Sequence, residues 1–492
     1  MTITLAEFDR RLAAGESMAG LRLERAELTG RDLAGPDLAG LTLERCNLSG
    51  CGLVGARLHG AILTDCDLSG VMLFGADLTA VRSSGCTWVG AVLVQADLAG
   101  ADFTGAQFGA IDCSRIRASG VRLAGANLAG AAFIGADLSR ADLRGADLSG
   151  AILVETDLRG ADLAAAVFAQ ALFTDTKIEP AALARARLAG AMLGELDLAG
   201  IDLHGHDLTD TSFAHADLSG ALLSGALMVG TDLSGARMKR VDLRQARIEA
   251  APLEGADLRE ADLSSATLVS VSLSDVQLAG ARFDGATMTG CVCERQDMTS
   301  GSWARLNATR CRFVGARWRG AALGGSTLVD CLFTGADLAG ADLTETEITG
   351  SVFIDADLHD ARLDRVRAGK AVFTGTNLRG ARAFGGIFHQ ALFGGAQLVR
   401  ADFTAADLRE TWCERVDATG ACFRDARMMW ADFAYAELDL ADFSGADAEG
   451  IGLHAARTDG TRWDRANRRN ARLTDPERLT GESRKAPAEA AE

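Results

Sequence analysis

Residues 136–150 read Ala-Asp-Leu-Ser-Arg, Ala-Asp-Leu-Arg-Gly and Ala-Asp-Leu-Ser-Gly, which is one five-residue unit written three times. The same frame runs from Leu23 to Leu473 without a slip: every fifth residue is in most cases Leu or Phe, and the residue two places earlier is most often Ala. The polar exceptions at the central position are Ser83, Thr458 and Arg468. A period of five fits neither an α-helix, with roughly 3.6 residues per turn, nor a strand, with a period of two. The sequence therefore predicts a chain that bends once per repeat.

Each five-residue unit contains a small residue and a large apolar residue that stand two positions apart. Alternate residues of an extended segment point to the same side, so both of these side chains can face inward. The polar residue between them and the two residues that follow face outward, and glycine at the fifth position allows the backbone of a corner. Four corners close a square coil of 20 residues, and stacked coils share backbone hydrogen bonds at about 4.8 Å.

This pattern, A-(D/N)-L-x-x, resembles that of the pentapeptide repeat family. The resemblance covers nearly the whole chain and implies an all-β solenoid, a right-handed quadrilateral β-helix. We expect this domain to span residues 18–473, with about 22 coils and a rod length of roughly 105 Å.

The two ends of the chain differ from the repeats. Thr4 and Glu7 form a capping box, and Gly15 can end a helix, so residues 1–17 are predicted to be an N-terminal capping helix. Such a helix would cover the exposed end of a solenoid. Residues 474–492 are predicted to be a disordered C-terminal tail.

Residues that lie 20 apart test the coil, because they should stack in columns. One column contains Phe313, Phe333, Phe353, Phe373, Phe393 and Phe433, and others contain Cys46, Cys66 and Cys86, or Cys291, Cys311 and Cys331. Residues 179–186 could instead form a looped-out helical segment, since Pro180 suits a helix start. The outward column continues in register across this segment, so the sequence favours an uninterrupted solenoid.

Composition excludes several classes of protein. The 492 residues include 56 Gly but only 5 Pro, which excludes collagen, and 48% are hydrophobic, which excludes a disordered chain. The net charge of −17 disfavours direct binding to nucleic acid or to an anionic membrane. No apolar run approaches the roughly 18 residues of a membrane helix, and no signal peptide opens the chain. Eleven cysteines without paired spacing favour a reduced, cytoplasmic setting.

No catalytic, cofactor-binding or metal site is predicted. Ten of the eleven cysteines occupy inward positions, where Cys replaces Ala in a core, and only Cys422 points outward. A metal site at Cys291, Cys293 and Cys311 is the alternative, but no histidine joins them. His206 is the one inward histidine, and it is predicted to be a hydrogen-bonded core residue. No nucleophile–base pair or phosphate-binding loop is present, so we expect a protein that is not an enzyme.

One side of the predicted coil carries apolar residues at outward positions. This apolar face consists of Met72, Phe74, Val92, Ile152, Leu172, Met192, Val292, Leu332, Val352, Val372, Leu392 and Trp412. A long exposed apolar strip is unusual for a monomer and indicates an interaction surface. The alternative is that β-branched residues simply suit a strand-like face. We expect the face to bind a protein partner of unknown identity or to form a homodimer.

A second side carries a column of carboxylates. This acidic face consists of Asp77, Asp97, Asp137, Asp157, Asp197, Asp217 and Asp257. The whole column, from Asp37 to Glu437, holds thirteen acidic and five basic residues. Some pentapeptide repeat proteins resemble DNA in shape and charge and bind type II topoisomerases. Bases at every third coil favour a ladder that neutralises itself instead.

Two function classes therefore stay open. The first is a non-enzymatic structural and protein-interaction scaffold that acts through its elongated surface. Residues 8–20, running directly into the repeats, are similar to pentapeptide modules linked to bacterial type VI secretion, which implies an adaptor role. The alternative is a DNA-mimicking regulator that binds DNA gyrase or another type II topoisomerase.

Overall fold

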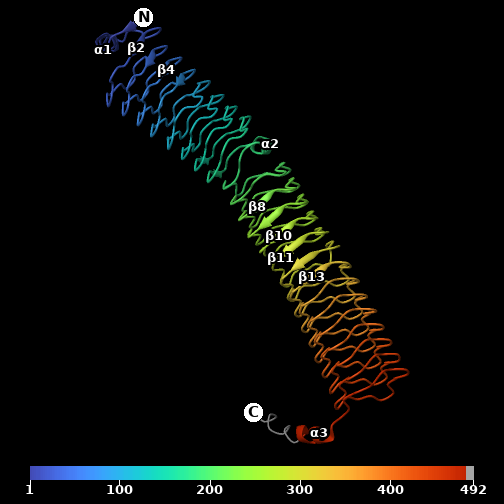
Figure 1. Ribbon diagram of the computed structural model, residues 1–492. Helices are drawn as coiled ribbons and strands as arrows, with labels where there is room; N and C mark the ends of the chain where they lie inside the picture. Colours follow the sequence, from blue (N-terminus) through green and yellow to red (C-terminus); the bar gives the residue numbers. More distant parts are fainter. Residues whose placement is uncertain (484–492) are drawn as a thin grey trace, which may run out of the picture. The chain divides into compact units, whose positions relative to one another are not determined.

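The computed structural model describes residues 1–483 and divides the chain into two compact units, unit 1 at Met1–Met238 and unit 2 at Lys239–Glu492. Figure 1 shows that each unit is a stack of similar coils. Unit 1 contains β1 (Thr2–Ile3), α1 (Leu5–Ala14), β2 (Arg22–Glu24), β3 (Thr42–Glu44), β4 (Ile62–Thr64), β5 (Arg82–Ser84), β6 (Ile152–Val154), β7 (Leu172–Thr174), α2 (Pro180–Leu183) and β8 (Leu227–Val229). Unit 2 contains β9 (Arg247–Glu249), β10 (Thr267–Val269), β11 (Thr287–Thr289), β12 (Asn307–Thr309), β13 (Thr327–Val329) and α3 (Pro476–Ser483).

The strands pair in parallel with the register that the repeat predicts. Leu23 of β2 lies beside Leu43 of β3, and in unit 2 Leu268 of β10 lies beside Met288 of β11. Single parallel bridges between residues 20 apart connect the remaining faces, as between Asp137 and Asp157. The predicted fold, a right-handed four-sided β-helix of five-residue repeats with a short N-terminal helix, is confirmed.

The corners of the coils take left-handed backbone conformations. Gly145 has φ 63°, and Arg140, at the preceding corner, has φ 57°. The outward aspartate helps to close the turn: the carboxylate of Asp137 accepts a hydrogen bond from the backbone N–H of Ser139 at 2.9 Å. Such side-chain bonds to the backbone two residues ahead favour turns over helix or sheet. The Ala-Asp-Leu unit therefore bends the chain as well as filling the core.

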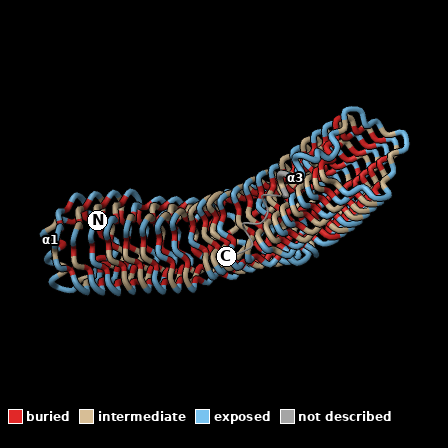
Figure 2. Tube along the Cα trace, turned by 90° about the horizontal axis from the view of Figure 1, so that it is seen from below, coloured by how far each residue is buried: buried red, intermediate tan, exposed pale blue. Residues whose placement is uncertain are grey.

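The interior of each unit is packed with the inward pair of every repeat. Leu143 is fully buried, and Figure 2 shows buried positions alternating with exposed ones around the coils. In unit 2 the predicted column of phenylalanines forms a stack, in which the rings of Phe333 and Phe353 lie 4.9 Å apart with an interplanar angle of 3°. Buried side chains thus fill the interior of the described coils.

The N-terminal helix α1 covers the first coil, as predicted. The hydroxyl of Thr4 accepts a hydrogen bond from the backbone N–H of Glu7 at 3.2 Å, and Gly15 ends the helix with φ 67°. Phe8 is 1% exposed and anchors the helix in the core. The helix thus closes an end at which the β-helix would otherwise expose its interior.

One helical turn, α2, interrupts a face of unit 1 without shifting the register. The bridges continue from Asp157 to Lys177 and from Val167 to Arg187, and Leu183 still occupies a buried central position. The prediction of an uninterrupted solenoid is therefore confirmed for the register. It is wrong for the backbone of this one face, because Pro180 starts a helical turn there.

The C-terminal segment differs from the prediction. Residues 474–492 were expected to lack regular structure, but α3 forms at Pro476–Ser483. Asp475 caps it, since its carboxylate accepts a hydrogen bond from the backbone N–H of Glu477 at 2.9 Å. The rest of the predicted tail, residues 484–492, lies outside the described residues.

Candidate functional site

The apolar face of unit 1 is built on consecutive coils. Ile152 pairs with Leu172, and Leu172 forms a bridge to Met192, so their side chains project from one column. They are 37%, 38% and 47% exposed, and Met72 and Phe74 are similarly open to solvent. Val92 also faces outward but is half-buried. The predicted outward orientation of these residues is therefore confirmed, while no observation tests whether they bind a partner.

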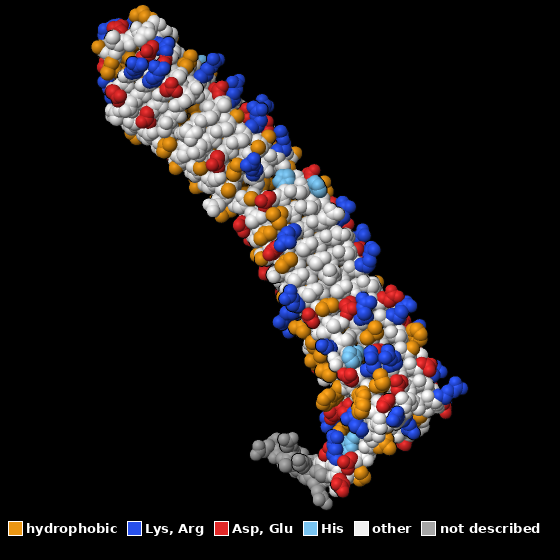
Figure 3. Space-filling view, in the orientation of Figure 1, with side chains coloured by type: hydrophobic (Ala, Val, Ile, Leu, Met, Phe, Trp, Pro, Cys, Tyr) orange, Lys and Arg blue, Asp and Glu red, His pale blue; other side chains and the backbone are white. Residues whose placement is uncertain are grey.

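The apolar face of unit 2 is less even. Bridges link Leu332, Val352, Val372, Leu392 and Trp412 in one column. Leu392 and Trp412 are exposed, whereas the other three, like Val292, are half-buried. Arg312 interrupts the column after Val292. In the view of Figure 3, hydrophobic side chains gather along the left-hand edge of each unit.

The acidic face is a partly neutralised ladder of charges. Arg117 pairs with Asp97 at 3.1 Å, and Arg237 pairs with Asp217 at 3.1 Å, each from the next coil. The sequence predicted this neutralisation by bases in the same column. Asp77, by contrast, accepts a hydrogen bond from the hydroxyl of Thr79 at 2.6 Å.

A second source of neutralisation was missed by the sequence interpretation. Arg159 pairs with Asp157, and Arg259 pairs with Asp257. Each arginine follows its aspartate by two residues, and each pair lies at 2.5 Å. The hydrogen bond from the Arg159 guanidinium lowers the pKa of Asp157, and that from Arg259 lowers the pKa of Asp257. The sequence feature that could have predicted these pairs is an arginine directly after Asp-Leu. Three members of the acidic face, Asp77, Asp137 and Asp197, have no ion pair within residues 1–483.

The cysteines behave as core residues. Ten are buried, and only Cys422 is partly exposed, as the repeat predicts. Burial raises the pKa of the Cys113 thiol, and it raises the pKa of Cys413 to about 12, so both thiols stay protonated at neutral pH. In the part of the chain that the structure describes, no three His, Cys, Asp or Glu side chains gather so that they could hold a metal ion.

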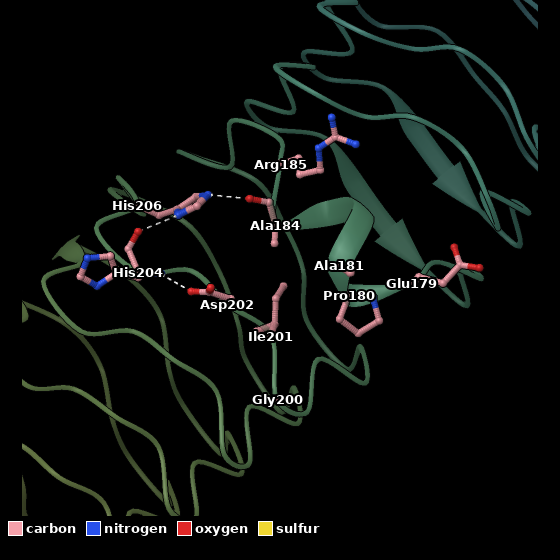
Figure 4. A pocket seen from close by; sticks show the side chains of 10 residues that line it. All are labelled: Glu179, Pro180, Ala181, Ala184, Arg185, Gly200, Ile201, Asp202, His204 and His206. Carbon is pink, nitrogen blue, oxygen red and sulfur yellow. Dashed lines mark hydrogen bonds between the residues drawn. The ribbon is translucent and has the colours of Figure 1, made fainter.

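His206 closes the coil where α2 interrupts it. Its Nε2–H donates to the carbonyl oxygen of Ala184 at 2.9 Å, just after the helical turn (Figure 4). The ring of the neighbouring His204 is instead bonded to the hydroxyl of Ser224 at 2.9 Å. A shallow groove of about 680 Å³ lies beside these groups and is lined by Pro180 and Ile201. The two imidazoles are hydrogen-bonded to the backbone and to the next coil, and they do not bond to each other as an acid–base pair would.

The structure also buries a histidine that the sequence placed outside. His454 follows an inward residue and was expected to face solvent, yet it is 6% exposed. Helix α3 covers it: the backbone N–H of Asp475 donates to His454 Nδ1 at 3.2 Å, and Glu482 lies 3.3 Å from Nε2. Tyr435 donates its hydroxyl hydrogen to the same carboxylate. These hydrogen bonds attach α3 to the side of the last coils.

No helix among residues 1–483 is both long enough and apolar enough to cross a membrane. Coils of five-residue repeats with a filled interior and chemically distinct outer faces define the class of this chain, which is a β-solenoid.

The sequence pattern of the pentapeptide repeats matches most of the solenoid. The matched residues are 51–81, 84–110, 111–150, 151–179, 181–220, 207–245, 256–292, 311–350, 331–367, 351–390, 396–434 and 413–447. These segments cover more than half of the chain, which therefore belongs to the pentapeptide repeat family. A comparison with curated proteins yields no match.

Several solved structures are similar to this chain. Full-length QnrB1, a plasmid-mediated fluoroquinolone resistance protein, is 14% identical over 45% of this chain and 99% of its own, with a TM-score of 0.29. HetL, involved in heterocyst differentiation regulation in the cyanobacterium Nostoc sp. strain PCC 7120, is 25% identical over 58% and 97%, with a TM-score of 0.13. Rfr23 from the cyanobacterium Cyanothece 51142 is 21% identical over 36% and 99%, with a TM-score of 0.14. These TM-scores are low, so the family assignment rests on the repeat pattern.

Proposed function

We propose that this protein is a non-enzymatic scaffold that binds other proteins through its apolar face. The observation that carries the proposal is the run of Ile152, Leu172 and Met192, which are 37% to 47% exposed on successive coils of a rigidly packed solenoid. Side chains of this size at outward positions contribute nothing to the interior. Burying them against a partner is favourable by about 25 cal/mol per Å² of apolar surface.

The architecture supports binding rather than catalysis. Its interior is filled by side chains, and the two histidines at the groove beside α2 are already bonded to the backbone and to the next coil. A β-solenoid instead offers long, flat faces on which each coil repeats the same contact. A stable interface needs roughly 1,000 Å² of buried surface, which several neighbouring coils supply together.

The test is the triple variant Leu172→Asp, Val352→Asp and Leu392→Asp. These side chains lie outside the coils, so the circular dichroism spectrum should stay that of the unchanged protein. Light scattering and native capture followed by mass spectrometry should then report the loss of a dimer or of a named partner. If the variant stays folded and every association persists, the proposal is wrong.

The partners to test first are components of bacterial type VI secretion, because residues 8–20 resemble the modules linked to that system. Purified components should bind the unchanged protein and fail to bind the triple variant. Binding that survives in the triple variant would assign the contact to another face.

The second candidate, a DNA-mimicking regulator of gyrase, is supported by the carboxylates of the acidic face that lack ion pairs among residues 1–483, which are Asp77, Asp137 and Asp197. The protein should then alter gyrase supercoiling at micromolar concentration. Reversing the charges of Asp137, Asp157, Asp197 and Asp217 should abolish that effect. An unchanged supercoiling activity of gyrase would exclude this candidate.

A further inference from the structure

A groove cuts into the apolar face of unit 1 beside Leu172 and Met192. It has a volume of about 580 Å³ and extends over three successive coils. Gly194 and Ala214 line it and stand where the preceding coils carry Val154 and Thr174. The groove lies next to exposed apolar groups and is large enough for one or two side chains of a partner.

Carboxylates form the rim of this groove. Asp175 and Glu195 lie on successive corners of the same edge, and Asp197 lies just beyond the corner; all three line the groove and are exposed. Among residues 1–483 none of them has an ion pair, although arginines neutralise many other carboxylates of unit 1, including Asp97 and Asp217. The groove is therefore lined by apolar side chains such as Leu172 and Met192, by these three carboxylates and by the imidazole of His215.

The rim differs from most of this edge. The earlier corners Gly55, Gly75, Gln95, Arg115 and Gly135 carry no carboxylate, and Glu155, the corner directly before Asp175, begins the acidic run. Met72 is 49% exposed in the same column as Met192, which is 47% exposed, yet no carboxylate stands on the corners beside it. The acidic run of this edge thus begins at Glu155 and continues along the groove at Asp175 and Glu195.

We propose that this groove binds a basic peptide segment of a partner protein, one that inserts a large apolar side chain between Leu172 and Met192 and places lysine or arginine against Asp175, Glu195 and Asp197. The proposal rests on the scaffold function above and specifies the chemistry of its partner. Apolar burial supplies affinity, and the unpaired carboxylates supply orientation and selection against acidic segments.

This assignment favours a peptide over a second copy of the chain. A second copy would bring its own acidic column and its net charge of −17 toward the same negative rim. Like charges placed opposite each other across an interface disfavour that contact. A short basic segment also suits the area, because three coils present too little surface for a stable dimer.

The test uses the full-length protein and a fluorescein-labelled peptide in which leucine and phenylalanine alternate with pairs of lysine. Fluorescence anisotropy should show saturable binding at micromolar concentration that weakens severalfold as salt is raised. A peptide with glutamate in place of lysine, and one with serine in place of the apolar residues, should each bind at least tenfold more weakly.

Matched variants locate the contact. Met192→Asp should weaken binding of the lysine peptide at least tenfold, whereas Met72→Asp, which makes the same change in the same column outside the groove, should have no effect. The double variant Asp175→Asn and Glu195→Gln should weaken binding and flatten its salt dependence, with Glu155→Gln on the same corner column as its control. Circular dichroism of each variant confirms that the coils are intact.

The inference is overturned if the peptide fails to bind, if the glutamate peptide binds equally well, or if Met192→Asp and Met72→Asp behave alike. None of these results bears on the scaffold function, which the triple variant tests separately with native partners. Conversely, partners that persist in the triple variant would reject the scaffold proposal even where the groove binds the lysine peptide.

Discussion

The two ends of the chain solve the same problem in different ways. At the start, α1 lies over the first coil and buries Phe8 to 1% exposure. In the last coil the interior is open: Leu473 is 66% exposed, and the half-exposed ring of Trp463 is covered by the guanidinium of Arg468 at 5.0 Å. A β-helix must protect the edge of its terminal coil from pairing with other chains. One end does so with an apolar cover, and the other with charge.

Polar residues at the central position of the repeat contribute to this difference between the two ends. Thr458 and Arg468, which break the repeat in the sequence, both lie in the last coil and are exposed. A charged residue that replaces an inward leucine makes the terminal coil a poor template for further stacking. Helix α3 does not replace this cover, since its hydrogen bonds reach Tyr435 and His454 on the side of the coils. The comparison predicts that equivalent substitutions have effects that fall from the interior to the C-terminal end.

The largest effect is expected in the interior, from Leu143→Asp. Leu143 is fully buried, and the new carboxylate would have no partner, so the free energy of unfolding should fall by about 4 kcal/mol or more. Thermal unfolding monitored by circular dichroism measures this loss. A variant that unfolds at the temperature of the unchanged protein would place residue 143 outside the core.

The comparison between the ends is tested by Phe8→Ala against Leu473→Ala. Removing the buried phenyl ring should cost about 3 to 5 kcal/mol in the stability of the cap and the first coils. Removing the exposed leucine should change stability by less than about 0.5 kcal/mol. Amide hydrogen exchange resolves the two, since only Phe8→Ala should speed exchange in the first coils. Equal losses of stability in Phe8→Ala and Leu473→Ala would show that the two ends are not protected in different ways.

A smaller effect is expected from Thr4→Ala. The Thr4 hydroxyl accepts the N–H of Glu7, and loss of such an N-cap costs about 1 kcal/mol. In Thr4→Ala, amide hydrogen exchange should become faster in α1 and stay unchanged in the coils of unit 2. Thr4→Ser, which keeps the hydroxyl, is the matched control and should behave like the unchanged protein.

The smallest effect concerns α3 and is visible through the single tyrosine of the chain. The hydrogen bond to Glu482 raises the pKa of Tyr435, so Glu482→Gln should return that pKa toward its ordinary value near 10. Tyrosinate absorbance in an alkaline titration measures the shift. An unchanged titration would show that α3 does not contact Tyr435 in solution.

The same contact gives a dependence on acid pH. The Tyr435 hydroxyl, followed by Arg478, lowers the pKa of Glu482 from an ordinary value of 4.5 to about 2. A carboxyl with a lowered pKa stabilises the docked state fully above its ordinary pKa, and the contribution is lost as pH falls toward 2. The protection of the α3 amides, measured relative to their intrinsic exchange rates at each pH, should therefore fall between pH 4.5 and 2 in the unchanged protein, and this fall should be absent in Glu482→Gln.

Local rules account for what was predicted correctly. Small and large apolar residues two apart determine which side chains face inward, and a frame that never slips makes every column follow from counting by 20. The cap at α1 was predictable because Thr4 and Gly15 act on backbone groups within the same helix. The two wrong predictions of backbone structure concern α2 and α3. Pro180 starts a helical turn where an extended face was expected, and Asp475 caps a helix where no regular structure was expected.

The sequence by itself determined the coil, its register and the identity of its faces, because burial and turn formation act within one repeat and recur in each. Only the tertiary structure decided which carboxylates are neutralised, since one arginine reaches Asp157 from two residues further along the chain and another reaches Asp217 from the next coil. It also decided that His454 is buried and that a groove opens beside Met192. These features depend on side chains that are brought together from different coils, and no repeat contains that information.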